Sequence, residues 1–108
     1  MSDLTWAPDA CTLPTPERPT RLAEFDDLFA TAVRGVERPS PIRARFALDP
    51  AAAARAAGLA VRESECCSFF TFTLGVTGGE VTLDVAVPER YRDVLDALAG
   101  RASAGMRA

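Results

Sequence analysis

The sequence predicts an α+β fold: a helix followed by β-α-β-β-α, with a three-stranded sheet and helices mainly on one face. Apolar residues recur at helical spacing in three stretches and at every second position in three others. Gly78-Gly79 is a typical two-residue hairpin loop between the last two alternating stretches. Because a strand–helix–strand crossover is right-handed, the strands take the order 1-3-2 of a split β-α-β unit.

The first helix is predicted to begin at Thr20, as N-cap, and to run to about Val36. Gly35 and Pro39 are interpreted as its end. The apolar positions that share its face are Leu22, Phe25, Leu28, Phe29, Ala32, Val33 and Val36.

A strand is predicted over residues 42–48, because its apolar residues alternate with Arg43, Arg45 and Ala47. Two arginines on the open face indicate a strand near a sheet edge. Asp49 as N-cap and Pro50 as first helical residue then begin a second helix, which runs towards Glu65.

The Gly-Gly loop sets the register between the strands at residues 70–76 and 81–87. Every apolar residue then faces another on the same side of the sheet. The predicted pairs are Val76 with Val81, Leu74 with Leu83, Phe72 with Val85, and Phe70 with Val87. The opposite side carries Thr71, Thr73, Thr82 and Asp84 and is predicted to face solvent.

The 108 residues form one predicted domain, residues 1–108. Residues 1–19 hold four prolines and are expected to be an irregular arm. A last helix begins at Pro88-Glu89 and is expected to end at Gly100, which leaves residues 101–108 as a frayed tail.

Composition excludes several classes of function. A net charge of −3 argues against nucleic-acid binding, which depends on clustered positive charge. The chain has no histidine and no lysine, which excludes Ser-His-Asp catalysis, His-ligated metals and Schiff-base chemistry. No apolar run is long enough to cross a membrane, and no signal peptide is recognisable. The sequence therefore predicts a cytoplasmic protein with reduced thiols.

Cys66-Cys67 is the motif with the most chemical content. Adjacent cysteines rarely form a disulfide with each other, but as thiolates they offer soft sulfur ligands, and Cys11 is a candidate third ligand. Such ligands select Hg(II), As(III) or Cu(I). Arg62 favours thiolate formation, whereas the nearby glutamates oppose it. The leading hypothesis is a thiolate module that binds a soft metal or metalloid ion through Cys66 and Cys67, with or without Cys11.

Two alternatives remain open. Cysteine is often a small buried apolar residue, so the pair could belong to the core of a structural or partner-binding module. One thiol could instead be the nucleophile of an enzyme, for instance one that cleaves organomercurials, with Asp9 or Glu63 as proton donor.

A resemblance supports the thiol hypothesis. Glu65-Cys66-Cys67-Ser68-Phe69-Phe70-Thr71-Phe72, followed by the Gly-Gly hairpin, resembles an E-C-C-x-F-x-x-F segment of small bacterial proteins. Related segments occur with MerR-type metal-responsive regulators. Residues 10–14 and 21–25 are similar to actinobacterial members, and the resemblance covers most of residues 10–98. It implies thiol-dependent metal or metalloid biology, but the predicted elements include no DNA-binding helix-turn-helix.

A homodimer is also predicted. Three helices do not fit side by side on one face of a three-stranded sheet, because helices pack about 8–10 Å apart and strands about 4.8 Å apart. The first helix is then displaced, and its apolar stripe needs a second surface. We expect the first helix or the edge of the first strand to form a two-fold contact. The alternative is that the proline-rich arm covers this stripe within one chain, with Trp6 and Leu13 as its anchors.

Overall fold

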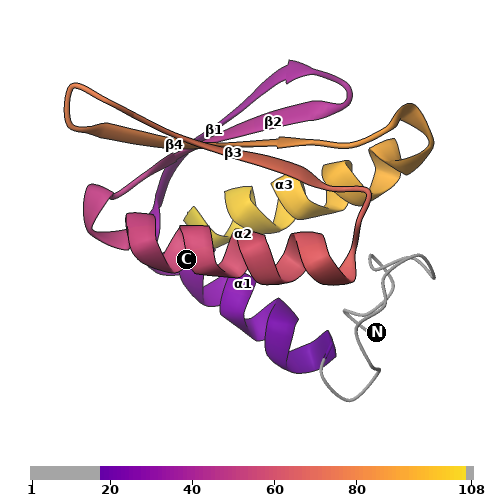
Figure 1. Ribbon diagram of the computed structural model, residues 1–108, viewed down its shortest axis with the longest axis horizontal. Coiled ribbons are helices and arrows are strands. Elements are labelled where there is room, and N and C mark those ends of the chain that lie inside the picture. The colour runs from indigo at the N-terminus through magenta and orange to yellow at the C-terminus, as the bar shows by residue number, and fades with distance from the viewer. Residues whose placement is uncertain (1–17, 107–108) are drawn as a thin grey trace.

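The computed structural model describes residues 18–106, with the side chains of residues 18–22 and of Cys66 excepted (Figure 1). Almost all of the predicted N-terminal arm, including Cys11 and Asp9, lies outside the described residues. Helix α1 (Arg18–Ala32) begins before Thr20. Thr20 therefore lies within the helix, and the prediction that it is the N-cap is wrong.

In the described part of the chain the sheet has four strands, and the predicted three-stranded sheet with order 1-3-2 is wrong. The strands are β1 (Val33–Ser40), β2 (Arg43–Leu48), β3 (Thr71–Thr77) and β4 (Glu80–Ala86). Their order is β1-β2-β4-β3, and all neighbours are antiparallel. The α+β class is confirmed. Because β1 adds an outer strand, β2 lies inside the sheet rather than at its edge.

Strand β1 occupies residues that were predicted as the end of the first helix and the loop after it. Val33 and Val36 stand at helical spacing, yet they pair with Leu48 and Phe46 of β2. The hairpin turn is closed locally, where the Ile42 N–H donates to Ser40 Oγ at 3.3 Å. Long-range pairing outweighs the local helical pattern here, because β-branched valine packs well on a half-buried sheet.

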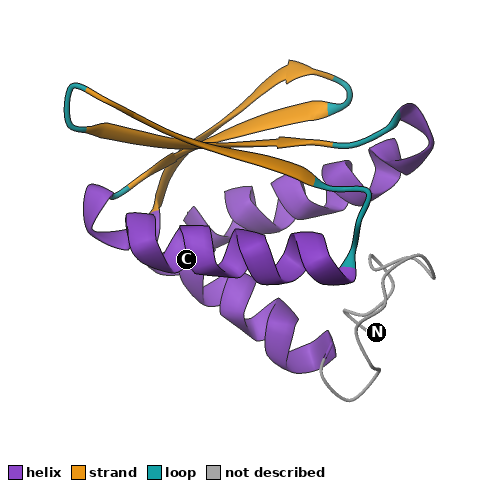
Figure 2. Ribbon diagram, viewed as in Figure 1, coloured by secondary structure: helices purple, strands orange, loops and turns teal. Residues whose placement is uncertain are grey.

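Within residues 18–106, three α-helices and two short 3-10 helices make the second layer. They are α1, η3 (Pro50–Ala52), α2 (Ala53–Cys66), η4 (Glu89–Tyr91) and α3 (Arg92–Met106). The helices gather on one face of the sheet, as predicted (Figure 2). The N-cap prediction at Asp49 is confirmed, since its Oδ1 accepts a hydrogen bond from the Ala51 N–H at 3.0 Å.

The predicted hairpin register is confirmed where both strands are present. Phe72 pairs with Val85, Leu74 with Leu83, and Val76 with Val81. Gly78 and Gly79 have φ values of 58° and 82°, which are open to glycine at little cost. Phe70 and Val87 are buried but lie just outside the strands.

The first helix is not displaced from the core. Phe25, Leu28 and Phe29 are buried, and the Phe29 ring stacks on Phe46 of β2 with centroids 5.9 Å apart. Helix α1 packs chiefly against α3. Its apolar stripe is therefore covered within one chain, and the reason given for a dimer through this helix is wrong.

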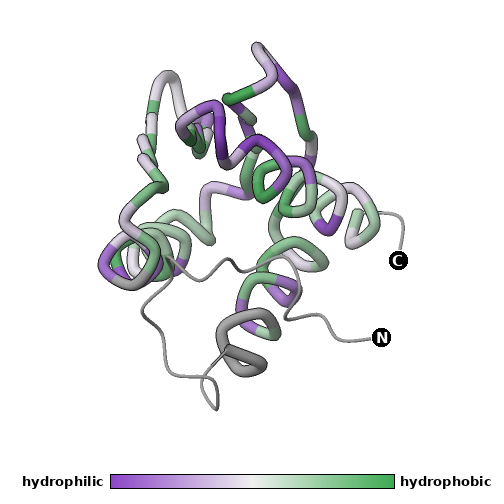
Figure 3. Tube along the Cα trace, turned by 90° about the vertical axis from the view of Figure 1, so that its right-hand side faces the viewer, coloured by the Kyte–Doolittle hydropathy of each residue, from purple (hydrophilic) through white to green (hydrophobic). Residues whose placement is uncertain are grey.

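Helix α3 continues past Gly100 to Met106, so the predicted end of the helix at Gly100 is wrong. Ala102 is fully buried, and Arg101 Nε donates to Asp26 Oδ1 at 3.0 Å. Packing against α1 holds this segment in a helix. Hydrophobic and hydrophilic residues alternate along the helices (Figure 3), a pattern typical of helices that pack one side against a core. Among residues 18–106, no helix is long and apolar enough to cross a membrane.

Candidate functional site: the corner between α2 and β3

The double cysteine lies at a sharp corner between helix and strand. Cys66 is the last residue of α2, and Cys67 is its C-cap, whose N–H donates to the Glu63 carbonyl at 2.7 Å. The Phe70 N–H then donates to the Cys67 carbonyl at 3.1 Å, one residue before β3 begins. These two bonds satisfy backbone groups that the helix end would otherwise leave unpaired.

Cys67 is buried, with 1% of its surface exposed, and it is disulfide-bonded. Its partner lies outside the described side chains. The expectation that all thiols are reduced is therefore wrong for this state of the protein. Within the described part of the chain, no three Cys, Asp or Glu side chains gather as a metal-binding group would. Cys11 and the Cys66 side chain, the other two predicted ligands, are not among the described atoms.

The two charged residues that precede the cysteine pair differ in burial: Arg62 is exposed and Glu63 is buried. Arg62 is exposed and binds Glu24 of α1 at 2.7 Å, so its charge is partly neutralised before it can favour a thiolate. Glu63 lies one turn before Cys67 and is 3% exposed, the only charged residue that is buried among the described side chains. Burying a carboxylate is costly unless it is partnered. The Glu63 side chain therefore belongs to the interior of this corner.

Aromatic side chains fill the corner beside the disulfide. The Phe69 ring stacks on Tyr91 of η4, with centroids 4.3 Å apart and planes 17° apart. It also contacts Phe70 at 4.6 Å, and Phe70 contacts Phe72 at 5.3 Å. Phe69 does not fit the alternation of the strand, and its contact with Tyr91 explains why it is buried.

A cavity of about 450 Å³ opens on this aromatic cluster. We call it the corner cavity. It lies where the turn after α2 meets the end of β4 and the 3-10 helix η4. The sequence analysis did not predict this cavity, because the residues on its two sides are distant in the chain. The neighbouring Arg90 and Tyr91, a cation beside an aromatic ring, were the available hint of it in the sequence. The lining includes Ser68, Phe69, Thr71, Val87, Arg90 and Tyr91.

The open face of the sheet carries a separate charged cluster. Arg45 Nε donates to Asp84 Oδ1 at 2.8 Å, and Arg43 lies 3.8 Å from the same carboxylate. Arg45 also lies 3.8 Å from Glu37 of β1. The β2 arginines therefore bind neighbouring strands instead of marking an edge.

Comparison of the chain with protein-family models, with curated proteins and with solved structures finds no match. The case for a function therefore depends on the chemistry of the corner: a buried, bonded Cys67, the adjoining Cys66, and the cavity beside them.

Proposed function

We propose that the protein is a thiol-dependent module that binds a soft metal or metalloid ion through Cys66 and Cys67, with or without Cys11. One observation carries the proposal: Cys67 is disulfide-bonded, so a second cysteine sulfur meets it at the corner. Two sulfurs that meet as a disulfide are, once reduced, close enough to share one ion at about 2.3 Å each. Soft thiolates favour Hg(II), As(III) and Cu(I) over hard cations.

In this proposal the disulfide is the oxidised, non-binding form. Reduction releases two thiols, and ion binding then displaces their protons. A reducing compartment such as the cytoplasm suits this cycle. Arg62 forms an ion pair with Glu24, and the buried Glu63 lies one turn from Cys67, so the protein offers the thiolates little positive charge. In this proposal the bound ion supplies most of the positive charge that stabilises them.

The test is a titration of the reduced protein with Hg(II), As(III) and Cu(I) against a competing chelator. We expect tight binding, loss of that binding in Cys66→Ser/Cys67→Ser, and no binding by the oxidised protein. Cys11→Ser removes one thiol and keeps the adjacent pair, so its affinity shows whether Cys11 contributes to binding beyond Cys66 and Cys67. Equal affinity in the double variant and the wild type would contradict the proposal.

We also propose that a second copy of the chain pairs with the edge of β3. The two edges of the sheet differ sharply. The β1 edge has Arg34, Glu37, Arg38 and Pro39, with two register irregularities, which are features that prevent edge pairing. The β3 edge, Thr71–Thr77, has no charge and no proline, and its register with β4 is regular.

The exposed residues of β3 suit pairing with an identical strand. Val76 is 65% exposed and Leu74 36%, beside Val61 of α2 at 59%. Antiparallel pairing centred on Leu74 places Phe72 opposite Val76 of the other copy, with threonines on the opposite face. A neutral strand pairs with its own copy without charge repulsion. A shallow groove of about 210 Å³ between α2 and β3 extends this apolar surface.

Sedimentation equilibrium at micromolar concentration tests the dimer. We expect a species of twice the 11.5 kDa chain mass, converted to monomer by Val76→Lys. Ala47→Lys is the control, since Ala47 is exposed on the inner strand β2, away from the edge. A wild type that sediments only as a monomer, or a Val76→Lys variant that remains dimeric, would refute pairing through β3.

A further inference from the structure

Arg90 differs from the other arginines whose side chains the structure describes. Each of the others lies within 4.0 Å of a carboxylate. Arg90 has no such partner among the described residues. Its guanidinium lies over the Tyr91 ring, 5.0 Å from the centroid, on the lining of the corner cavity. A positive charge that no described side chain neutralises therefore borders this cavity.

Further hydrogen-bond donors line the same space. Ser68 and Thr71 contribute hydroxyl groups, and Tyr91 belongs to the lining as well. Within residues 18–106, none of these three hydroxyls has a hydrogen-bond partner in the protein. Ser68 comes from the turn after α2 and Thr71 from the start of β3, whereas Arg90 and Tyr91 come from η4. Two segments distant in the chain thus offer unused donors to one cavity.

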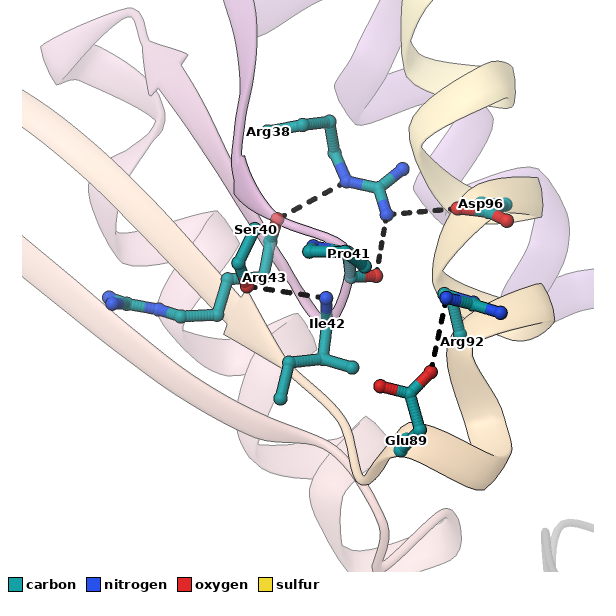
Figure 4. Close-up of polar contacts among 8 residues, drawn as sticks. All are labelled: Arg38, Ser40, Pro41, Ile42, Arg43, Glu89, Arg92 and Asp96. Carbon is teal, nitrogen blue, oxygen red and sulfur yellow. Dashed lines mark hydrogen bonds and ion pairs between the residues drawn. The ribbon is translucent and has the colours of Figure 1, made fainter.

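Among the residues that the structure describes, no carboxylate lines the cavity, and the acidic residue next to Arg90 in the sequence is already paired. Glu89 binds Arg92 at 3.2 Å, and this pair lies on the first turns after β4 (Figure 4). Its charge therefore does not cancel that of Arg90. The inner wall is apolar, formed by Phe69 and Val87, which are 8% and 4% exposed. The cavity combines a cation, hydroxyl donors and an aromatic surface.

We propose that the corner cavity binds a small organic oxyanion, a carboxylate or phosphate carried on a flat aromatic body. Arg90 binds the oxyanion, because a guanidinium matches its geometry and charge. Ser68 and Thr71 donate the remaining hydrogen bonds. The aromatic body lies against the stacked rings of Phe69 and Tyr91. A volume of about 450 Å³ falls within the range of small-ligand pockets.

This inference does not depend on the thiol proposal. The cavity is present while Cys67 is disulfide-bonded, so the ligand is expected to bind the oxidised protein. Loss of metal binding in the cysteine variants would leave the cavity unaffected. Failure of the oxyanion titration would, in turn, leave the thiol proposal in place.

The test uses the full oxidised chain and three probes: benzoate, phenyl phosphate and benzyl alcohol. Binding is followed by amide chemical shifts. We expect at least one anion to shift the amides of residues 68–71, 86–87 and 89–91, and the neutral alcohol to bind at least about tenfold more weakly. The first two probes distinguish a carboxylate ligand from a phosphate ligand. Equal binding of the alcohol, or no shift at these residues with either anion, overturns the proposal.

Two variants distinguish a specific contact of Arg90 with the anion from a general effect of net charge. Arg90→Gln is expected to weaken anion binding about 10- to 100-fold, the usual effect of losing hydrogen bonds to a charged group. Arg92→Gln is the matched control: it removes the same charge from an exposed neighbour that binds Glu89 and does not line the cavity. We expect binding within about twofold of wild type there. Equal weakening in both variants would overturn the assignment to Arg90.

Discussion

Arg38 of β1 binds Asp96 of α3, with Nη2 2.9 Å from Oδ1. The same guanidinium donates to two carbonyls of the hairpin turn, Pro41 O at 2.8 Å and Arg43 O at 3.2 Å (Figure 4). One side chain therefore closes the β1–β2 turn and ties it to the last helix. This contact helps to hold residues 33–40 as a strand in a segment whose local pattern is partly helical.

We predict that Arg38→Ala lowers the free energy of unfolding by about 1–2 kcal/mol, because it removes the ion pair and both turn hydrogen bonds. Asp96→Asn removes only a solvent-screened ion pair and costs about 0.5 kcal/mol or less. Urea unfolding measures both. An Asp96 variant as unstable as the Arg38 variant would show that the turn hydrogen bonds contribute little.

Two glycines of α3 should respond to alanine in opposite ways. A Cβ on Gly100 meets no atom within 4 Å, so Gly100→Ala is expected to stabilise by about 0.5–1 kcal/mol through helix propensity. A Cβ on Gly105 would lie 3.0 Å from Phe29 Cβ and 3.2 Å from its backbone carbon. Gly105→Ala therefore forces α3 away from α1 and is expected to destabilise by about 1–2 kcal/mol. Thermal unfolding of the two variants checks the sign, and stabilisation by both would refute close packing at Gly105.

Asp84 is the common partner of Arg43 and Arg45 on the open face of the sheet. Asp84→Asn keeps the shape but removes the charge, and we predict a loss of about 1 kcal/mol. Glu80→Gln is the control, since Glu80 lies on the same strand, is exposed and pairs with no arginine among the described side chains. Its expected effect is within about 0.5 kcal/mol of zero. Equal losses in the two variants, measured by urea unfolding, would indicate a net-charge effect.

The parts of the fold that the sequence predicts are those with local causes. The register of β3 with β4 follows from Gly78-Gly79 and from alternating side chains, and both lie within one hairpin. The cap at Asp49 is likewise local. Strand β1 could not be predicted in this way, because Val33 and Val36 also satisfy helical spacing. Their pairing with Leu48 and Phe46 decides the outcome, and this is a long-range contact.

The same distinction between local and long-range causes applies to the candidate site. The adjacent cysteines and their place at the end of a helix are visible in the sequence. The disulfide at Cys67 and the burial of Glu63 depend on packing. The corner cavity requires the turn after α2 to meet η4, so Arg90 gains its significance only when Ser68 and Thr71 are brought to it.

The disulfide at Cys67 leads to a prediction about stability. A disulfide stabilises mainly by restricting the unfolded chain, so reduction should lower the free energy of unfolding by about 2–4 kcal/mol. We therefore expect a phosphine reductant to lower the urea midpoint of the wild type and to leave that of Cys67→Ala unchanged. Because Cys67 is 1% exposed, reductant should reach the bond mainly when the corner opens. The reduction rate should then rise with urea well below the midpoint. A wild-type midpoint that does not respond to complete reduction would contradict a stabilising disulfide at Cys67.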